Sequence, residues 1–493
     1  MPFSSDSTLF QSNDRKYSFD ELINSLPNVH FSTNKYELDR HGRGESYHAC
    51  LLPNIIAYPS IIGEIQTIVK YCVSRRIPII PYGAGTSVEG HVTPLKGGLS
   101  LDMMNFQSIT FSGESNGCNA TTTDLLAIVG AGVTRKQLNE HLKSTGYQFV
   151  VDPGANATIG GMFSTCASGT TTVKYGTMRN NVLAATCVLP DDDATMVKVG
   201  SQALKNAAGY DLLSLLCGSE GTLGIVTDVT VKLHPIQQFV VSAVSVFHTL
   251  HEAAQAVSTM KLYDLSLVRC ELLDSTSVEA FNSYNLSTEN FQPMIVKPTL
   301  FLEFEGSTSE SALNEQVMQA ENVCMNDCNG RSFQAASKES ERNVLWAARH
   351  QLYYAAIAYR KGATSAIVTD ACVPLSQFSN VLLETAQDVE NAGVVGPCFG
   401  HAGDGNLHCI LPTCDDDTIE YRNKLHGVAN RLMDRTLAVG GTCTGEHGIG
   451  YGKIGYLQKQ YEDSGTLHLM KIIKRAIDPY NIMNPGKVIA YDD

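Results

Sequence analysis

Ile77-Pro-Ile-Ile-Pro-Tyr-Gly-Ala-Gly-Thr-Ser87 joins an apolar run to a loop of small residues. The apolar part predicts a strand that ends where the loop begins. Gly83 and Gly85 lack a Cβ, so the backbone N–H groups of the loop can approach a phosphate closely, and the two hydroxyl residues that follow add donors. The loop has neither the Gly-Lys-Ser/Thr of a Walker loop nor the G-x-G-x-x-G that opens a dinucleotide-binding helix. Taken alone, G-x-G is more often a plain turn.

Two further glycine-rich segments follow within the same part of the chain. The first runs from Val151 to Gly161 and continues through Ala167-Ser-Gly169 and Lys174-Tyr-Gly176. The second is Gly218-Ser-Glu-Gly-Thr-Leu-Gly-Ile-Val226. Three such segments between apolar runs favour a phosphate-binding interpretation of the first loop over a plain turn.

A second group of polar residues lies near the C-terminus, in Phe399-Gly-His-Ala-Gly-Asp-Gly-Asn-Leu-His408 and Gly445-Glu-His-Gly-Ile-Gly450. In a straight strand, residues seven apart point to opposite faces, but the Gly-Asp-Gly insert can turn the chain and bring both imidazoles to one side. Glu446 would then complete a His/His/carboxylate metal site with open positions, leaving the adjacent His447 to move a proton. The alternative is a pair of strand-end histidines and a turn cap. Because both of these stretches, 399–408 and 445–450, are rich in glycine, the metal site is the favoured interpretation.

The composition excludes several classes of protein. A chain of 493 residues is expected to form two domains, and a net charge of -14 without a basic block argues against a nucleic-acid partner. The 14 cysteines are scattered without a C-x-x-C pair, which predicts reduced thiols. The first thirty residues show no signal peptide and no clear transit peptide, and no transmembrane helix is predicted. These features leave a mitochondrial or a cytoplasmic location open.

Hydrophobic spacing predicts most of the secondary structure. A helix is expected after Ser60 as its N-cap, with Ile61, Ile65, Ile68, Val69 and Cys72 on its apolar face. Strands are expected at Leu99–Leu101, Leu125–Val129 and Leu183–Leu189, and a capping box at Thr134 and Gln137. Later strands are expected at Phe239–Phe247 and Leu300–Phe304, with helices near 250–261, 308–325, 339–360, 375–391, 418–438 and 466–477.

The sequence pattern changes after His234-Pro235: glycines become fewer, and longer predicted strands and helices alternate. This pattern predicts an α+β cap built on an antiparallel sheet. The expected organisation is a lead-in over 1–50, a cofactor domain over 51–235, a substrate or cap domain over 236–450, and a C-terminal segment over 451–493 that folds back on the cofactor domain.

With these motifs in place, the chain resembles the vanillyl-alcohol-oxidase (PCMH) type of FAD-binding protein, within its FAD-linked D-lactate dehydrogenase and glycolate oxidase group. Asn484-Pro-Gly-Lys487 also matches that group. The resemblance implies an α+β fold with a PCMH-type FAD-binding domain of two subdomains plus the cap. It implies FAD contacts at Pro81, Tyr82, Gly83, Ala84, Gly85, Thr86, Ser87, Gly90, Pro153, Gly154, Thr158, Gly160, Gly161, Ser164, Ser168, Gly169, Tyr175, Gly176, Glu220, Gly221, Ile225 and Asn484.

Three departures from the relatives refine this expectation. Relatives that attach FAD covalently often carry a histidine where this chain has Thr86, so non-covalent FAD is expected and His91 is assigned to the surface or to a supporting position. Relatives acting on 2-hydroxyglutarate carry a lysine where this chain has Val368, which argues against a dicarboxylate substrate. The run of histidines used by ether-lipid-forming transferases of this fold is absent.

The chemistry expected of such a site is oxidation of a D-2-hydroxy acid, D-lactate first, to the 2-keto acid. FAD would take the hydride at N5, and His447 would accept the hydroxyl proton. A divalent metal, zinc or manganese, on His401, His408 and Glu446 would hold the substrate. Within Trp346-Ala-Ala-Arg349, Arg349 is the expected clamp for the substrate carboxylate.

Several alternatives remain at this stage. Asn406 either orients substrate or stabilises its turn. The substrate could be glycolate or another D-2-hydroxy acid, and a non-redox flavoprotein transferase of the same fold is the alternative class. The expected partners are the small hydroxy acid and an electron acceptor, which could be cytochrome c, a quinone or an electron-transfer flavoprotein. Either a monomer or a homodimer is compatible with the sequence.

Overall fold

The computed structural model describes residues 17–111, 124–288, 291–306 and 309–490. The first sixteen residues of the expected lead-in therefore lie outside the described residues. The chain divides into two compact units. Unit 1 comprises residues 1–167, 177–235 and 447–493, and unit 2 comprises residues 168–176 and 236–446.

Unit 1 contains a first, mixed sheet with the strand order β1-β2-β4-β3. Strand β4 pairs in parallel with both β2 and β3, whereas β1 pairs antiparallel with β2. The parallel strands are almost entirely buried, as expected for strands covered on both faces. The elements of this part are α1 (Asp20–Ser25), β1 (His30–Ser32), α2 (Lys35–His41), β2 (Ile55–Tyr58), α3 (Ile62–Arg75), β3 (Ile79–Tyr82) and β4 (Leu99–Asp102).

The helix expected after Ser60 is α3, but its start differs from the prediction. Ile61 is the N-cap residue and is 61% exposed, so it does not join the apolar face. The carboxylate of Glu64 accepts hydrogen bonds from the backbone N–H groups of Ser60 and Ile61. Because Glu64, at the third helical position, bonds the N–H of Ile61, the cap falls on Ile61 instead of Ser60. The remaining predicted positions are buried, with Val73 added.

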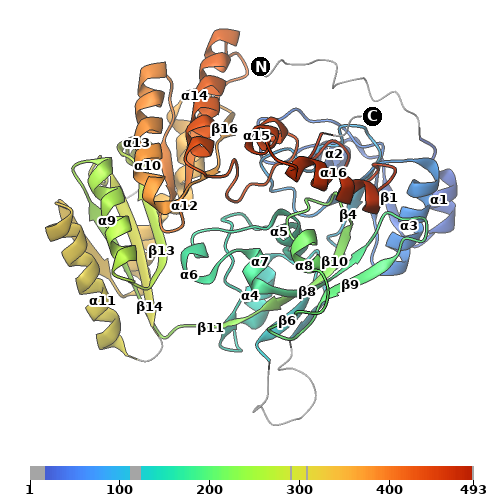
Figure 1. Ribbon diagram of the computed structural model, residues 1–493, viewed down its shortest axis with the longest axis horizontal. Coiled ribbons are helices and arrows are strands. Elements are labelled where there is room, and N and C mark those ends of the chain that lie inside the picture. Colours follow the sequence, from blue (N-terminus) through green and yellow to red (C-terminus); the bar gives the residue numbers. More distant parts are fainter. Residues whose placement is uncertain (1–16, 112–123, 289–290, 307–308, 491–493) are drawn as a thin grey trace. The chain divides into compact units, whose positions relative to one another are not determined.

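A second, antiparallel sheet of unit 1 has the strand order β5-β6-β10-β8-β9 and is coloured teal to green in Figure 1. The predicted capping box is present, since Thr134 and Gln137 bond each other's backbone N–H at the start of α4. The strands are β5 (Ile109–Phe111), β6 (Leu126–Gly130), β7 (Tyr147–Gln148), β8 (Val182–Val188), β9 (Met196–Gly200), β10 (Ile225–Lys232) and β11 (His234–Pro235), of which β7 and β11 form a separate pair. The helices are α4 (Arg135–Leu142), α5 (Ile159–Thr165), α7 (Met178–Asn181), α8 (Leu212–Leu216), α15 (Ile454–Gln460) and α16 (Thr466–Ile477).

Unit 2 is built on one large sheet with the strand order β15-β12-β14-β13-β18-β19-β16, and β17 pairs with β19 beside this path. Every pairing in it is antiparallel. The predicted α+β fold class, with an antiparallel sheet in the second half of the chain, is confirmed. The strands are β12 (Phe239–Val246), β13 (Leu267–Leu273), β14 (Thr299–Gly306), β15 (Ser332–Ala336), β16 (Ser365–Val368), β17 (Ala371–Cys372), β18 (Cys398–His401) and β19 (Asn406–Thr413).

Helices α9, α11, α12, α13 and α14 of unit 2 confirm the predicted positions within a few residues, whereas α6 and α10 were not predicted. Helices α10 and α12 pack on the sheet face that carries Leu273, Phe301 and Phe399, and Trp346 of α12 lies in this core. Helices α9 and α11 lie beside β13 and β14, and α13 packs against α14 (Figure 1). The helices are α6 (Thr172–Tyr175), α9 (Leu250–Leu262), α10 (Ser275–Asn285), α11 (Glu310–Asn322), α12 (Glu339–Tyr359), α13 (Leu375–Ala392) and α14 (Ile419–Ala438), and a π-helical turn, Val323–Asp327, extends α11.

Two whole-chain expectations can be compared with the described residues. Within them, no helix combines the length and the apolar character needed to cross a membrane. The cysteines described by the structure are free thiols, as the spacing of the cysteines in the sequence predicts.

Candidate active site

The two predicted histidine ligands lie on a β-hairpin of unit 2 formed by β18 and β19. In its register His401 faces Asn406 and Phe399 faces His408, so the two histidines are diagonal neighbours on one face. Their ring centroids are 5.5 Å apart with the planes at 89°. Residues 402–405 make the turn, and Gly405 has a φ of +86°. A Cβ at this position would lie 2.3 Å from the carbonyl oxygen of Val373, so only glycine fits. The Gly-Asp-Gly insert therefore brings both imidazoles to one side, as predicted.

The carboxylate of Glu446 meets both imidazoles. Its Oε1 is 3.2 Å from Nε2 of His401 and 3.1 Å from Nε2 of His408. The ligand atoms of these three residues all lie within 4.8 Å of one another. Ser168, predicted as a flavin contact, donates its hydroxyl to the other oxygen of Glu446 at 3.2 Å.

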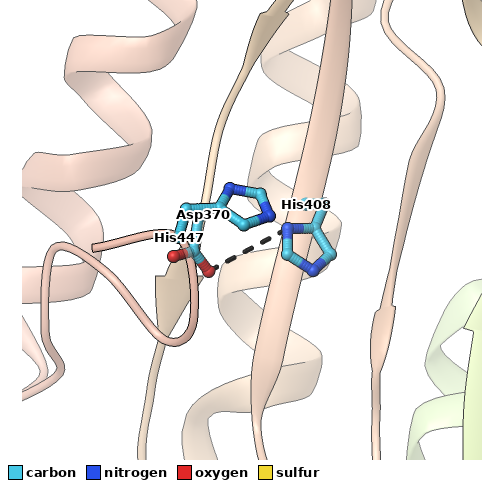
Figure 2. Close-up of side chains that lie close together, drawn as sticks. All are labelled: Asp370, His408 and His447. Carbon is cyan, nitrogen blue, oxygen red and sulfur yellow. Dashed lines mark ion pairs between the residues drawn. The ribbon is translucent and has the colours of Figure 1, made fainter. Parts of the chain in front are cut away.

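Asp370 holds the turn that carries Glu446. Its Oδ2 accepts hydrogen bonds from the hydroxyl of Thr444 at 2.6 Å and from the backbone N–H groups of Gly445 and Glu446 at 2.8 and 3.0 Å. Figure 2 shows its other side, where Oδ1 forms an ion pair with Nδ1 of His408 at 4.0 Å. Asp370 thus links the turn to β19. Nothing in the sequence had assigned this role to Asp370.

The hydrogen bonds of the two imidazoles fit a metal site. Nδ1 of His401 lies 2.6 Å from Oε1 of Glu271, and Nδ1 of His408 lies 3.1 Å from the carbonyl oxygen of Thr369. When Nδ1–H donates to such an acceptor, the Nε2 lone pair is left to bind a metal. Both Nε2 atoms point to the same carboxylate oxygen, and two imidazoles with one carboxylate suit zinc or manganese. The donor set is therefore compatible with the expected divalent ion.

The charges in this cluster depend on one another. Burial favours the neutral imidazole of His401, but the carboxylates of Glu271 and Glu446 outweigh it and raise its pKa well above the usual value. Burial likewise opposes ionisation of both carboxylates, yet His401 lowers the pKa of each, with Arg349 contributing at Glu271 and His408 at Glu446. Burial raises the pKa of the nearby Asp404 to about 6. The cluster is a buried, charge-compensated centre.

Arg349 reaches this centre through Glu271, a residue that sequence analysis did not single out. Arg349 lies one helical turn after Trp346 on α12, and its Nε–H donates to Oε2 of Glu271 at 2.5 Å. Its guanidinium carbon is 5.0 Å from the centroid of the Phe399 ring. The only sequence signal for Glu271 was its charge in the mainly apolar β13, which also carries Arg269.

The remaining candidate of the hairpin, Asn406, is buried beneath the turn that follows α14. A Cβ on Gly445 would lie 2.5 Å from its amide oxygen, so turn and amide are in close contact. The amide oxygen makes no hydrogen bond within the described residues, and the role of Asn406 stays a prediction. His447, the proposed base, is the residue after Glu446, is half-buried, and begins the C-terminal segment of unit 1; it is labelled in Figure 2.

In unit 1, three glycine-rich frames lie close together: the Pro81–Ser87 loop, the part of the second segment around Thr158, and the segment that contains Gly221. A Cβ on Gly83 would lie 2.4 Å from the hydroxyl oxygen of Thr158, and one on Gly221 would lie 3.2 Å from the Pro81 ring. The backbone N–H of Glu220 donates to the carbonyl of Ser164 at 2.7 Å. The Pro81–Ser87 loop is thus closely flanked by both other frames, and residues 83–87 are half-buried. Such a surface suits a pyrophosphate, and FAD is compatible with it.

The other predicted flavin residues of unit 1 fall into the same region. Gly85 has a φ of +71°, and a Cβ there would lie 2.3 Å from the Tyr82 hydroxyl. Thr158 caps α5 by accepting a hydrogen bond from the N–H of Gly161 at 3.2 Å. Buried Ile225 begins β10. Ala84, Thr86, Ser87 and Gly90 continue the first loop, and Pro153, Gly154, Gly160 and Ser164 lie before and within α5.

Two predicted flavin residues have protein partners that fix the C-terminal segment of unit 1. Glu220 accepts backbone hydrogen bonds from Ile449 and Gly450, each at 2.7 Å, and lies 3.1 Å from Nε2 of His91. The amide of Asn484 donates to the carbonyl oxygens of His91 and Glu220 at 3.0 and 2.9 Å. The side chain of Glu220 therefore holds the loop that follows His447, and the side chain of Asn484 ties the later part of this segment to His91 and Glu220.

Four predicted flavin residues belong to unit 2 rather than to unit 1. Gly169 donates its N–H to the hydroxyl of Thr172 at 2.9 Å, and Gly176 ends α6. Tyr175 donates to Glu305, and burial together with this carboxylate raises the pKa of Tyr175. With Ser168 bonded to Glu446, this segment is tied to the sheet of unit 2.

Comparisons with known proteins agree with this architecture. Family models match at residues 236–488, described as the C-terminal domain of FAD linked oxidases, and at residues 53–200, described as an FAD binding domain. A Danio rerio protein named "Probable D-lactate dehydrogenase, mitochondrial" is 41% identical over 92% of this chain and 87% of its own length. "D-lactate dehydrogenase [cytochrome], mitochondrial" of Arabidopsis thaliana is 36% identical over 95% of this chain and 80% of its own length. The structure of p-cresol methylhydroxylase with substrate bound has a TM-score of 0.74 at 16% identity, covering 95% of this chain and 96% of that one, which shows a shared fold.

Proposed function

Because this chain belongs to the family of FAD-linked oxidases, we propose that it is an FAD-dependent dehydrogenase that oxidises D-lactate to pyruvate. The observation that carries the proposal is the convergence of two imidazoles and a carboxylate beside an arginine, in unit 2. A 2-hydroxy acid carries a hydroxyl and a carboxylate on adjacent carbons, and these are the groups that such a set of residues can hold.

FAD, when bound, supplies the acceptor for the hydride that leaves the substrate carbon. The chain's part is to bind the cofactor without a covalent link. The backbone N–H groups around Gly83 and Gly85 and the hydroxyls of Thr86 and Ser87 would hold its pyrophosphate. The Gly83–Thr158 and Gly221–Pro81 contacts support this assignment, since they keep the three frames together in unit 1.

His401, His408 and Glu446 would hold a divalent ion, which supplies Lewis acidity toward the substrate oxygens. The hydrogen bonds from Nδ1 of the two histidines to Glu271 and to the carbonyl of Thr369 support this role, because they orient both Nε2 atoms.

Arg349 would bind the substrate carboxylate. Its Nε–H is occupied by Glu271, so the terminal nitrogens are the ones that would form the paired hydrogen bonds to a carboxylate. The half-buried His447 would accept the hydroxyl proton, a role suited to an imidazole near neutral pH.

We assign the electron acceptor and the compartment from the relatives. The Arabidopsis thaliana relative is named as a cytochrome-type mitochondrial enzyme, and a cytochrome is therefore the proposed acceptor in preference to a quinone or an electron-transfer flavoprotein. A mitochondrial location follows from the same names.

The decisive experiment is the anaerobic visible spectrum of the FAD- and metal-loaded protein before and after D-lactate, with L-lactate as the control. Bleaching of the flavin band by D-lactate alone is expected. A flavin band that persists with D-lactate but is bleached by glycolate would move the substrate to that acid. A band that no hydroxy acid bleaches would refute dehydrogenase chemistry and favour the transferase class.

A further inference from the structure

Glu271 lies at the centre of unit 2 between two residues of different function. It is in the middle of β13, in the otherwise mainly apolar segment Leu267–Leu273, and its side chain is completely buried. It projects from the same sheet face as Leu273, two residues on, which is the face covered by α10 and α12. In the sheet register it stands directly opposite His401 of β18.

Each carboxylate oxygen of Glu271 serves a different partner. Oε1 lies 2.6 Å from Nδ1 of His401, and Oε2 accepts the Nε–H of Arg349 at 2.5 Å. A buried carboxylate is costly unless its oxygens are paired and hydrogen-bonded, and both conditions are met by these two donors. His401 lies on strand β18 and Arg349 on helix α12, so the carboxylate connects these two elements through hydrogen bonds.

The geometry fixes both partners. With Nδ1–H of His401 directed to Glu271, its Nε2 faces Glu446 at 3.2 Å. With Nε–H of Arg349 directed to the same carboxylate, the plane of the guanidinium is set and its terminal nitrogens are left for another anion. Moving Glu271 would therefore disturb both groups together.

We propose that Glu271 is a positioning residue that aligns the metal ligand His401 and the carboxylate clamp Arg349 through one side chain, so that metal binding and substrate binding depend on the same residue. This inference rests on the proposed function and adds to it a residue outside the His401–His408–Glu446 set.

The Glu271→Gln variant tests the two contacts together. Both partners are donors. An amide offers one acceptor oxygen and one NH2 group and carries no charge, so the variant loses one of the two bonds and weakens the other. The matched control is Glu303→Gln on β14. Glu303 is also buried and also bonds an arginine, Arg269 at 2.6 Å, and it accepts the hydroxyl of Ser242 at 3.0 Å.

Two quantities are measured for each protein. The first is the dissociation constant of Zn²⁺ and of Mn²⁺ from the FAD-loaded, metal-stripped protein, by competition with a chromophoric chelator. The second is the pair kcat and KM for D-lactate. For Glu271→Gln we expect metal binding weakened by about 10–100-fold and KM raised about tenfold or more through the loss of a charge-assisted contact. Glu303→Gln is expected to leave the metal dissociation constant unchanged.

The outcomes separate this inference from the proposed function. A wild-type protein that binds neither metal refutes the proposed metal site and this inference with it. If the wild type binds metal and is bleached by D-lactate, an unchanged dissociation constant or an unchanged KM in Glu271→Gln overturns the positioning role, as does an equal metal defect in Glu303→Gln. Should Glu271→Gln fail to fold, Glu271→Asp, which keeps two acceptor oxygens on a shorter stem, is measured in the same way, and values equal to wild type for both quantities overturn the inference.

Discussion

Asp274 provides a direct test of the electrostatics of unit 2. It is the N-cap of α10, where its carboxylate accepts a hydrogen bond from the N–H of Ser277 at 2.6 Å. Burial raises its pKa from 3.8 to about 6, although the hydrogen bonds from Ser277 partly oppose the shift. The perturbation is Asp274→Asn, because asparagine caps helices about as well as aspartate but carries no charge.

The sign of the effect follows from the direction of the shift. Since the pKa of Asp274 is higher in the folded chain than in the unfolded one, folding favours the protonated form. The stabilisation from this proton is complete below the ordinary value of 3.8 and is lost as the pH rises through about 6. Above that pH the folded chain must hold a buried charge that Asp274→Asn does not have.

The magnitude follows from the difference between the two pKa values, 6 minus 3.8, or about 2.2 units. At 1.36 kcal/mol per unit, the variant should be more stable than the wild type by about 2–3 kcal/mol at pH 7.5. The difference should shrink through the interval between pH 6 and pH 4, where wild-type Asp274 becomes neutral.

The chain has a built-in probe for the assay. Trp346 is its only tryptophan, and it lies in the same core as Val278 and Phe281 of α10. Urea unfolding followed by tryptophan fluorescence at several pH values therefore reports on the part of unit 2 that contains Asp274. The control is Asp211→Asn in unit 1, where an exposed aspartate caps α8 and accepts the N–H of Ser214 at 3.0 Å.

If the stability difference between Asp274→Asn and wild type stays constant from pH 4.5 to pH 7.5, the reasoning is refuted. Removal of a group that titrates in this range must make the difference change with pH. A variant that is less stable at pH 7.5 would show that the hydrogen bond to Ser277 outweighs burial. Asp211→Asn should leave the Trp346 transition unchanged at every pH.

Further predictions concern the site and its supports. Arg349→Lys keeps the charge but loses the planar fork, so KM for D-lactate in steady-state kinetics should rise about tenfold or more, and an unchanged KM would contradict the clamp. Asp370→Ala removes the acceptor for the turn that carries Glu446 and should weaken Zn²⁺ binding about 10–100-fold in a competition titration, whereas wild-type affinity would show that the turn needs no anchor. Glu220→Ala leaves two buried backbone N–H groups without an acceptor and should lower the free energy of unfolding of unit 1 by about 2–5 kcal/mol, measured by circular dichroism in urea. A loss of less than half that size would show that other acceptors bond these N–H groups in the variant. Metal removal by chelation should abolish bleaching by D-lactate while the flavin band remains, and added Mn²⁺ or Zn²⁺ should restore it; bleaching that survives complete removal would exclude a role for the metal.

Sequence reasoning was most successful where the determinants are local. The helices α9, α13 and α14 were predicted within a few residues because their apolar spacing and caps lie within each segment. The Phe399–His408 hairpin was predicted for the same reason, since its turn residues stand between the two histidines. The predicted N-cap of α3 was one residue too early: Glu64, at the third helical position, bonds the N–H of Ile61 and so places the cap at Ile61.

Long-range partners were not predictable in the same way. Glu271 stands 130 residues before His401, and it shares the otherwise mainly apolar β13 with a second charged residue, Arg269, so no pattern singles it out. The carboxylates of Asp370 and Glu220 bond backbone N–H groups of segments that follow them by 75 and more than 200 residues. Backbone donors have no residue-type signature, so such contacts leave no pattern in a single sequence.

The sequence by itself therefore determined most of the elements, the α+β class and the hairpin that places His401 beside His408. Only the tertiary structure decided which buried carboxylate orients which side chain: Glu271 for His401 and Arg349, and Asp370 for the turn of Glu446. The physical reason is that turns and helices are set by neighbours along the chain, whereas a buried charge must find its partners across the sheet, wherever the strand register brings them.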